Sequence, residues 1–413
     1  MEVLHSHCCG LDVHEKTVVA CLLTPGTGAK AKREVRTFGT FTRDLDGLAD
    51  WLGEAGCTDV AMESTGSYWK PVCNRLEGRF KVMVVNARHL KTVPGRKTDV
   101  KDAEWIADLL QHGLLRPSFI PERDLREVRE VTRYRVKLVQ ERASEANRIQ
   151  KVLQEANIKL GQVASNVLGV SGRAILAELA GGEDDPEVLA KLARGQLVKK
   201  HADLVAALTG SVGEHLRFML TEQLGHVQEL DERILRVEVE IGRRQANRGE
   251  SEMVARLDTI PGVAEATART LVAEVGTDME VFGSAERLSS WAGVCPGMQE
   301  SAGKNASGRA PKGNATLRTT LVQAAHATSR TDTFLGALYR RLARRIGPSR
   351  AAMAVAHRIL VYAFHMMKQK ADYKDLGANY QDERQKERSE RYFRGALERL
   401  GYNVQLTPTP IPV

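Results

Sequence analysis

The stretch HCCGLDVHEKTVVACLL, residues 7–23, decides the fold of the N-terminal region. It holds two β-rich apolar runs, 7–13 and 17–23, which are separated only by the three polar residues 14–16. So short a connection between two such runs predicts a β-hairpin. Asp12 lies inside the first run, where a buried charge is costly unless it is paired or binds a metal.

Downstream of the hairpin, strand and helix patterns alternate. Strands are predicted at 34–41, 57–63 and 80–87, and helices from Thr42 onward, at 68–78 and at 98–115. Thr42 is expected to be the N-cap of the first of these helices. This order of elements predicts an α/β domain over residues 1–120 and, by analogy, an RNase H-like fold.

The rest of the chain is predicted to be all-α. Two long amphipathic helices, at 122–160 and 220–247, have the heptad spacing of a coiled-coil region over 121–250, and they pair either with each other or across subunits. Residues 251–370 form a further helical domain, with helices expected at 331–346 and 348–370. Within it, Pro261-Gly262 resembles the turn of a helix–hairpin–helix unit, whose backbone N–H groups bind phosphate. Residues 371–413 are expected to be a charged, loose tail.

The composition is compatible with a nucleic-acid partner without being diagnostic. The formal net charge is +8, and 27% of the 413 residues are charged. The chain lacks both a run of about 18 apolar residues and a secretory signal pattern, so we expect a cytoplasmic protein with no membrane contact. The six cysteines include no CxxC pair, which predicts buried free thiols rather than a disulfide framework or a zinc site.

Four carboxylates lie where metal ligands would be expected. Asp12 lies in the first strand, Glu63 ends the fourth, and Asp99 and Asp102 are three residues apart on one helical face. Carboxylates that hold two Mg²⁺ ions would suit phosphoryl transfer. For Asp99 and Asp102 alone, a helix cap and a first helical turn are the favoured interpretation, and only the acids at the other two places favour a metal site.

Five segments carry a resemblance to a known family. They are GLDVHEKT (10–17), AMESTGSYWKPV (61–72), KTDVKDAEWIADLL (97–110), IPGVAEATARTLVAEVG (260–276) and WAGVCPGMQESAGKNASGRAPKGNATLR (291–318). Together they resemble the DEDD insertion-sequence transposases, relatives of the Piv/MooV invertases and understood as bridge-RNA-guided DNA recombinases. The resemblance covers roughly residues 5–370.

The resemblance implies a RuvC-like domain, a coiled-coil region and a C-terminal transposase domain with an essential serine. It implies that the acidic tetrad Asp12, Glu63, Asp99 and Asp102 binds Mg²⁺, two ions per site. Ser301 in ESAGK is implied as the nucleophile that forms a serine–DNA intermediate, with Ser307 in NASGR as the alternative. The implied partners are insertion-sequence and target DNA, a guide RNA, and further copies of the chain in a dimer or tetramer with a composite site.

Basic residues near these motifs are expected to contact nucleic-acid phosphates, although a solvated basic surface would have the same sequence pattern. They are Arg96, Lys97, Lys101, Lys304, Arg309, Lys312 and Arg318, joined by the backbone at Gly262.

Two other functions stay open at this point. A RuvC-like structure-specific endonuclease would cut by hydrolysis, with Ser301 incidental, and a non-catalytic nucleic-acid-binding protein would use the fold without its chemistry. Tyr68 and Trp69 could stack on a base or pack in the core, and His357 and His365 on an apolar helix are expected to be structural.

Overall fold

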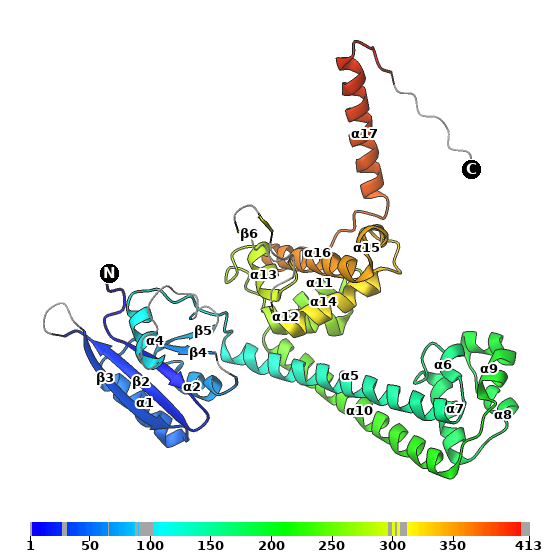
Figure 1. Ribbon diagram of the computed structural model, residues 1–413, viewed down its shortest axis with the longest axis horizontal. Helices are drawn as coiled ribbons and strands as arrows, with labels where there is room; N and C mark the ends of the chain where they lie inside the picture. The colour runs from blue at the N-terminus through cyan, green and yellow to red at the C-terminus, as the bar shows by residue number, and fades with distance from the viewer. Residues whose placement is uncertain are drawn as a thin grey trace. The chain divides into compact units, whose positions relative to one another are not determined.

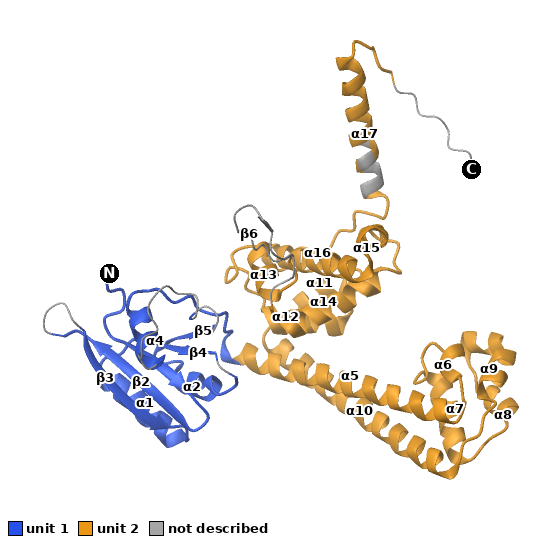
Figure 2. Ribbon diagram, in the orientation of Figure 1, with its two compact units in different colours: residues 1–123 blue, residues 124–413 orange. Residues whose placement is uncertain are grey.

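The computed structural model describes residues 2–26, 31–64, 66–86, 90, 102–295, 300–301, 304–305 and 312–405. The chain divides into two compact units, Met1–Arg123 and Asp124–Val413 (Figure 2). The first is a mixed α/β unit and the second is largely helical, as the sequence predicts.

The first unit is built on a five-stranded sheet with strand order β3-β2-β1-β4-β5. The strands are β1 (Cys8–Val13), β2 (Thr17–Thr24), β3 (Lys32–Gly39), β4 (Asp59–Glu63) and β5 (Lys81–Val85). β1, β2 and β3 form an antiparallel meander, which confirms the predicted hairpin, whereas β4 is parallel to β1 and β5 is parallel to β4.

Helices cover both faces of this sheet (Figure 1). Helices α1 (Thr42–Glu54) and α2 (Trp69–Leu76) share one apolar core with the sheet, and α4 (Asp102–Gln111) shares another with the opposite face. The prediction for Thr42 was wrong, because Thr42 is the first residue of α1 and extended Phe41 is the N-cap. The backbone carbonyl of Phe41 accepts the first helical hydrogen bonds, from the N–H groups of Asp44 and Leu45, and no side chain caps the helix.

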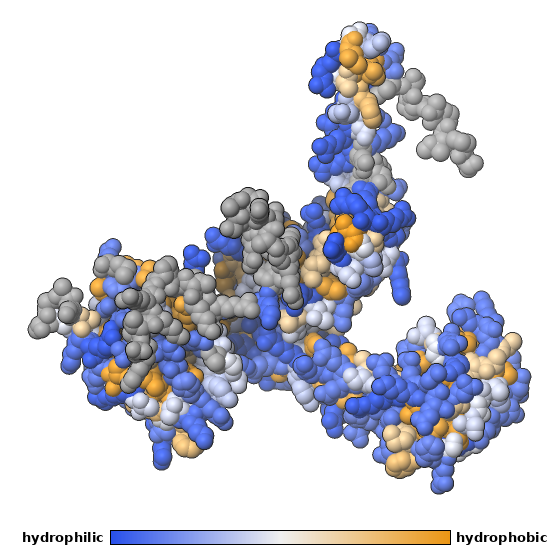
Figure 3. Space-filling model, viewed as in Figure 1, coloured by the Kyte–Doolittle hydropathy of each residue, from blue (hydrophilic) through white to orange (hydrophobic). Residues whose placement is uncertain are grey.

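In the second unit, one long helix runs away from a helical bundle and a second long helix runs back to it. Helices α5 (Arg123–Glu155) and α10 (Glu214–Asn247) lie side by side within the chain (Figure 1). Pairing across subunits, the other possibility for the heptad pattern, stays a prediction. Ion pairs join them, among them Arg135 to Glu238 at 2.5 Å and Arg244 to Glu127 at 3.1 Å. The surface of the two helices is mainly hydrophilic in the view of Figure 3. We call this helix pair the arm.

A small helical cap closes the far end of the arm. It consists of α6 (Leu160–Val163), α7 (Val170–Gly181), α8 (Pro186–Ala190), the 3₁₀ helix η1 (Gly195–Lys200) and α9 (His201–Leu208). Buried residues of the cap form one apolar core with the adjoining ends of α5 and α10.

The bundle follows α10. Its helices are α11 (Ser251–Asp258), α12 (Glu265–Val275), α13 (Ala285–Ala292), α14 (Ala315–Thr328), α15 (Phe334–Ile346) and α16 (Pro348–Gln369). The last helix, α17 (Tyr380–Arg399), corrects the prediction of a loose tail. Its sequence is rich in Glu, Arg, Lys and Gln, which are strong helix formers even without an apolar core to pack on.

All six cysteines are free, and five of them are buried. None of the described helices has both the length and the apolar character needed to cross a membrane.

Candidate functional site

Asp12 and Glu63 lie at the carboxyl ends of neighbouring parallel strands. The last paired residues of β1 and β4 are Leu11 and Met62, and Asp12 and Glu63 each follow by one residue. Leu11 and Met62 belong to the core shared with α1 and α2. Because successive side chains of a strand alternate between faces, Asp12 and Glu63 lie on the opposite face, which α4 covers. Both carboxylates are half-buried there.

Gly10 allows α4 to approach this face closely. A Cβ atom at Gly10 would lie 2.3 Å from both the backbone oxygen of Ala103 and the backbone nitrogen of Ala107. Ala103 directly follows Asp102, the exposed first residue of α4. Arg33 of β3 also binds α4, through Asp108 at 2.7 Å. The structure thereby brings three of the four predicted acids to one face of one sheet.

His14 is a neighbour of Asp12 that the sequence did not reveal. Its Nε2 lies 3.1 Å from Oδ2 of Asp12. The His14 side chain is 61% exposed and the Asp12 side chain only 26% exposed, so the imidazole can leave without disturbing the sheet. The signal in the sequence was the spacing DVH, which places the histidine two residues after the aspartate.

The carboxylate set fits a hard divalent cation in its chemistry, because it offers only oxygen donors from separate backbone elements. Asp99 lies outside the described residues. Among the described ones, no group of three or more His, Cys, Asp or Glu side chains converges closely enough to hold a metal. Asp12, Glu63 and Asp102 lie on one face of the sheet, and their role as metal ligands stays a prediction.

The predicted nucleophile lies in a short hairpin of the second unit. Ser301 belongs to β6 (Glu300–Ser301), which pairs antiparallel with β7 (Lys304–Asn305), so that Ser301 faces Lys304 across the hairpin backbone. For these residues the structure describes the backbone alone.

The chain leaves and re-enters the bundle at a single point around this hairpin. A Cβ atom at Gly313 would lie 2.3 Å from the backbone nitrogen of Gly293, so only a glycine at position 313 allows the two chain segments to pack this closely. The N–H of Asn314 also donates to the carbonyl of Trp291 at 3.3 Å. The serine loop, residues 294–312, is thus held at its base.

A buried carboxylate anchors the exit of the serine loop. Glu274 of α12 is fully buried and accepts two hydrogen bonds from Arg133 of α5, at 2.7 and 2.8 Å. Its Oε2 also accepts from Nδ2 of Asn314 at 2.6 Å, while Oδ1 of Asn314 caps α14 by accepting from the N–H of Leu317. Arg129 lies 3.4 Å from the same carboxylate, and burial lowers its pKa to about 10 although Glu274 acts in the opposite direction. One acidic side chain therefore ties the arm, α12 and the end of the serine loop together.

Gly262 has a structural explanation of its own. Its φ of +84° is in the left-handed region, and a Cβ would lie 2.4 Å from the carbonyl oxygen of Ala324 in α14. The glycine is required by this turn and this packing, so a phosphate contact there stays a prediction.

The remaining predicted residues are distributed as follows. Lys312 is exposed and Arg318 half-buried near the start of α14. Tyr68 is 44% exposed and Trp69 packs against the first core, while His357 is half-buried and its pKa is lowered by that burial. The structure does not describe Arg96, Lys97, Asp99, Lys101, Ser307 or Arg309.

Two family models match the chain. A DEDD transposase model of the IS110 type, described as a transposase, matches residues 9–158, and a model described as a transposase of the IS116/IS110/IS902 family matches residues 254–340. Together they span more than half of the sequence, and each contains one part of the candidate site. The chain belongs to the DEDD-type insertion-sequence transposases. No curated protein matches it.

As a DEDD-type insertion-sequence transposase, the protein is an enzyme that cleaves and recombines DNA, and it binds DNA to do so. Membership of this family also implies that activity depends on a divalent metal. The first match contains Asp12, Glu63, Asp99 and Asp102, and the second contains Ser301 together with Glu274 and Asn314. Helix α17 lies beyond both matches.

Proposed function

We propose that this transposase exchanges DNA strands through a covalent serine–DNA intermediate, with Ser301 as the nucleophile and a bridge RNA as the guide. The observation that carries the proposal is the packing of the residues at which the serine loop returns to the bundle. Gly313 packs against the backbone of Gly293, and Asn314 donates to the buried carboxylate of Glu274.

The proposed fold of the first unit is RNase H-like, of the RuvC type. The meander of β1, β2 and β3, with β4 joining β1 in parallel, supports this assignment. We further propose that the arm is a two-helix coiled coil. We propose four domains: the RuvC-like domain over 1–120, the coiled-coil region over 121–250, the transposase domain over 251–370 and the charged C-terminal segment over 371–413.

Asp12, Glu63, Asp99 and Asp102 are the residues that would hold Mg²⁺, two ions per site. When bound, Mg²⁺ would neutralise charge on the scissile phosphate and favour the reactive form of the attacking oxygen. The exposed His14 side chain would leave Asp12 free for this role.

Ser301 would attack the scissile phosphorus through Oγ. The Oγ–P bond forms as the bond from phosphorus to the leaving-strand oxygen breaks, and the leaving strand takes a proton to end in a hydroxyl group. The hydroxyl of a different strand then attacks the phosphoserine, which restores the serine and joins the new strands. Water takes no part, so the number of phosphodiester bonds is conserved.

Basic residues would position the nucleic acids around these groups. Lys304, Lys312 and Arg318 lie near Ser301 in the chain, and Arg309 falls in the same loop. Arg96, Lys97 and Lys101 flank Asp99, and Gly262 would offer backbone N–H groups. With the guide RNA reading sequence by base pairing, the protein needs only contacts to shape and backbone.

Asp12, Glu63 and Asp102, which we call the acidic edge, belong to the first compact unit, and the serine loop belongs to the second. This division suits a composite site completed by different protomers of a dimer or tetramer. Mixing Ser301→Ala protein with Asp102→Ala protein should then restore partial activity, whereas each variant alone should be inactive.

A cleavage assay tests the serine mechanism. The purified protein is combined with its guide RNA, labelled insertion-sequence DNA and Mg²⁺, and covalent adducts are resolved on a denaturing gel. We expect an adduct with the wild type and with the matched control Ser307→Ala, and none with Ser301→Ala or Asp102→Ala. Cleavage that survives in Ser301→Ala would indicate a hydrolytic nuclease, and no cleavage by any protein would indicate a binding role.

A further inference from the structure

Two exposed aromatic side chains of the first unit follow strands that end at the acidic edge. Phe41 follows β3 and is 74% exposed, and Tyr68 follows β4 and is 44% exposed. Among the residues of this unit that the structure describes, no other phenylalanine, tyrosine or tryptophan is exposed. The exposed rings of the unit are therefore concentrated in one part of it.

The directions of the strands place both rings at the same edge of the sheet. β2 pairs antiparallel with both β1 and β3, so β3 runs parallel to β1 and to β4. The carboxyl ends of these three strands therefore lie together. β3 is two strands away from β1, about 10 Å, whereas β4 is next to β1. Phe41 on the β3 side and Tyr68 on the β4 side thus flank Asp12.

A chain of contacts joins Phe41 to the acidic edge. Oγ1 of Thr40, the residue before Phe41, donates a hydrogen bond to the backbone carbonyl of Glu15 at 2.9 Å. Glu15 belongs to the turn between β1 and β2 and directly follows His14, whose Nε2 lies 3.1 Å from Oδ2 of Asp12. The corner that carries Phe41 is thereby held against the turn that follows Asp12.

The fold makes no use of the Phe41 ring. Phe41 belongs to neither apolar core of the first unit, and it caps α1 through its backbone carbonyl alone. The guanidinium of Arg43 lies 5.9 Å from the centroid of the ring and is 84% exposed, with only a 3.5 Å contact to Asp44. An exposed ring beside an arginine suits a nucleotide, because the base stacks on the ring while the arginine contacts a phosphate.

The occupant of this edge follows from the activity of the enzyme. Charge does not select it, because the nearby segments carry both signs, at Glu15, Lys16, Arg43 and Asp44. The protein binds and cleaves DNA, and the proposed acidic edge requires the scissile strand to reach Asp12 and Glu63. A protein partner that covered both Phe41 and Tyr68 would also cover these carboxylates and exclude that strand. DNA is therefore the occupant that the reaction itself brings to the two rings.

The rings also indicate the state of the DNA. The bases of a duplex are already stacked on one another, so an aromatic side chain gains a stacking partner only from an unpaired base. We propose that Phe41 and Tyr68 hold an unpaired segment of the DNA strand at the acidic edge, with one base stacked on each ring. The phosphate between these bases lies at Asp12 and Glu63, and Arg43 contacts the phosphate beside Phe41.

This inference rests on the proposed role of the acidic edge and deepens it. It names the substrate that the edge accepts, a strand that has been opened, and it assigns Phe41 and Tyr68 as positioning residues. Neither ring takes part in the chemistry, and both fix the strand along the line of the carboxyl ends of the strands.

Photocrosslinking locates the stacked bases directly. The probe is a DNA duplex with a short unpaired bubble that contains iododeoxyuridine, and the same duplex without the bubble is the matched control. The full-length protein is irradiated with each probe in the absence of guide RNA, and crosslinked tryptic peptides are identified by mass spectrometry. We expect the bubble to crosslink within residues 37–43 and 44–75, which contain Phe41 and Tyr68, and the paired duplex to give no such crosslink.

Binding by variants measures the contribution of each ring. Phe41→Leu and Tyr68→Leu should each weaken binding of the bubble about fivefold or more, and binding of the paired duplex by less than about twofold. Phe41→Trp and Tyr68→Phe keep a ring and should bind like the wild type. The matched control Phe218→Leu removes a 64% exposed phenylalanine from α10 and should have no effect. The urea midpoint of Phe41→Leu should equal that of the wild type, because the ring lies in neither core.

Several results would overturn the proposal. They are crosslinks confined to other parts of the chain, a paired duplex that crosslinks as strongly as the bubble, and equal losses in Phe41→Leu and Phe218→Leu. Stronger crosslinking at the same peptides by single-stranded RNA would identify RNA instead of DNA as the occupant. Failure here is distinguishable from failure of the proposed mechanism, because Ser301→Ala cannot form the adduct but should crosslink the bubble like the wild type. The acidic edge is tested separately, by cleavage with Asp102→Ala.

Discussion

Replacing Gly10 by alanine should lower the stability of the first unit and displace Asp102 of the proposed acidic edge. The new Cβ would lie 2.3 Å from two backbone atoms of α4, and neither atom can rotate away as a side chain would. Since ordinary carbon contacts begin at about 3.5 Å, α4 must move by about 1 Å to admit the methyl group.

The expected magnitudes follow from this displacement. Overpacking of this kind costs about 1–3 kcal/mol of stability. Asp102 moves with the start of α4, away from Asp12 and Glu63. If these carboxylates are the metal ligands, a misplacement of about 1 Å should slow DNA cleavage about 100-fold.

Urea unfolding followed by tryptophan fluorescence measures the first effect, because Trp51, Trp69 and Trp105 lie in the first unit and only Trp291 lies in the second. The matched control is Gly47→Ala on α1, where no heavy atom lies within 4 Å of the new Cβ. This control should be as stable as the wild type or more stable by up to about 1 kcal/mol, since alanine favours a helix over glycine.

The reasoning is refuted if Gly10→Ala unfolds at the same urea concentration as the wild type. A destabilised variant that still cleaves DNA at the wild-type rate, at a temperature where it remains folded, would separate the position of α4 from catalysis. The acidic edge would then have to be abandoned as the metal site.

Three further predictions concern the second unit. Glu274→Leu leaves Arg129 and Arg133 beside a buried apolar side chain and should lower the free energy of unfolding, measured by thermal unfolding, by about 3–5 kcal/mol. The control Glu265→Leu removes a surface ion pair and should lower it by less than about 1 kcal/mol. Equal losses would show that the buried network does not stabilise the protein. Gly262→Ala places a Cβ 2.4 Å from the carbonyl of Ala324 at a φ of +84° and should cost more than about 2 kcal/mol, so wild-type stability in urea would contradict the packing described. Burial lowers the pKa of His357 in the folded state, so its contribution to stability is complete above the unfolded value of 6.5 and is lost as the pH falls toward the folded pKa. The urea midpoints at pH 7.5 and 5.5 should therefore differ less in His357→Gln than in the wild type. An equal difference would show that His357 does not cause the pH dependence of stability.

Local patterns explain how much of the fold could be predicted. The β1–β2 hairpin follows from two apolar runs and a three-residue connection, and α15 and α16 follow from helical periodicity. Helix α17 lacks a continuous apolar stripe, so its sequence was equally consistent with an unstructured charged tail. At Thr42, residue type suggested a cap, but the backbone of Phe41 already accepts the first hydrogen bonds of α1.

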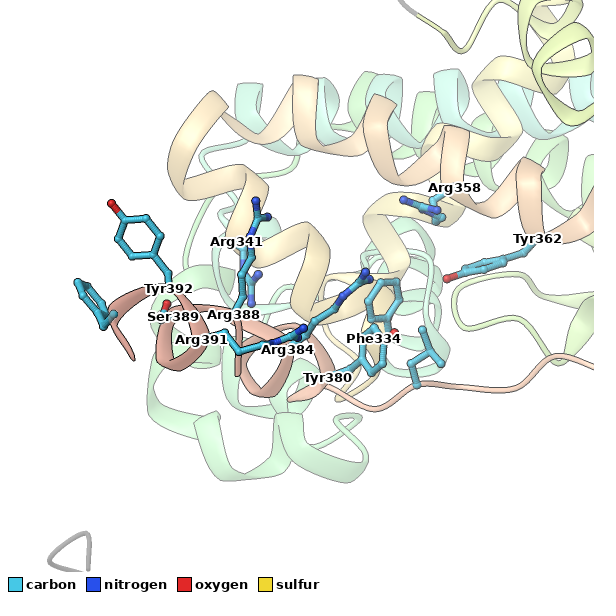
Figure 4. Close-up of a pocket in the computed structure, with 12 residues that line it drawn as sticks. Phe334, Arg341, Arg358, Tyr362, Tyr380, Arg384, Arg388, Ser389, Arg391 and Tyr392 are labelled. Atoms are coloured by element: carbon cyan, nitrogen blue, oxygen red, sulfur yellow. The ribbon is translucent and has the colours of Figure 1, made fainter. Parts of the chain in front are cut away.

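The candidate site was predictable where strand order alone decides proximity. The parallel pairing of β1 with β4 places Asp12 and Glu63 each one residue beyond the same pair, as the analogy with an RNase H-like order of elements led us to expect. The contact between Glu274 and Arg133 joins residues 141 positions apart, and no local pattern encodes it. The pocket between α15, α16 and α17 likewise requires three helices to meet, which no local pattern encodes (Figure 4).

The arm also has a consequence for how such a protein could change in size. Helices α5 and α10 have 33 and 34 residues, so each is about 50 Å long. Both of their inner ends are fixed at the bundle, by the Arg133–Glu274 pair for α5 and by the bond from Gln245 to the carbonyl of Arg269 for α10. Removing seven residues from each helix would shorten the arm by about 10 Å and keep the same helix faces in contact. Matched insertions or deletions of seven residues in both helices could therefore change the distance from bundle to cap in steps of two helical turns, without altering the contacts at either end of the arm.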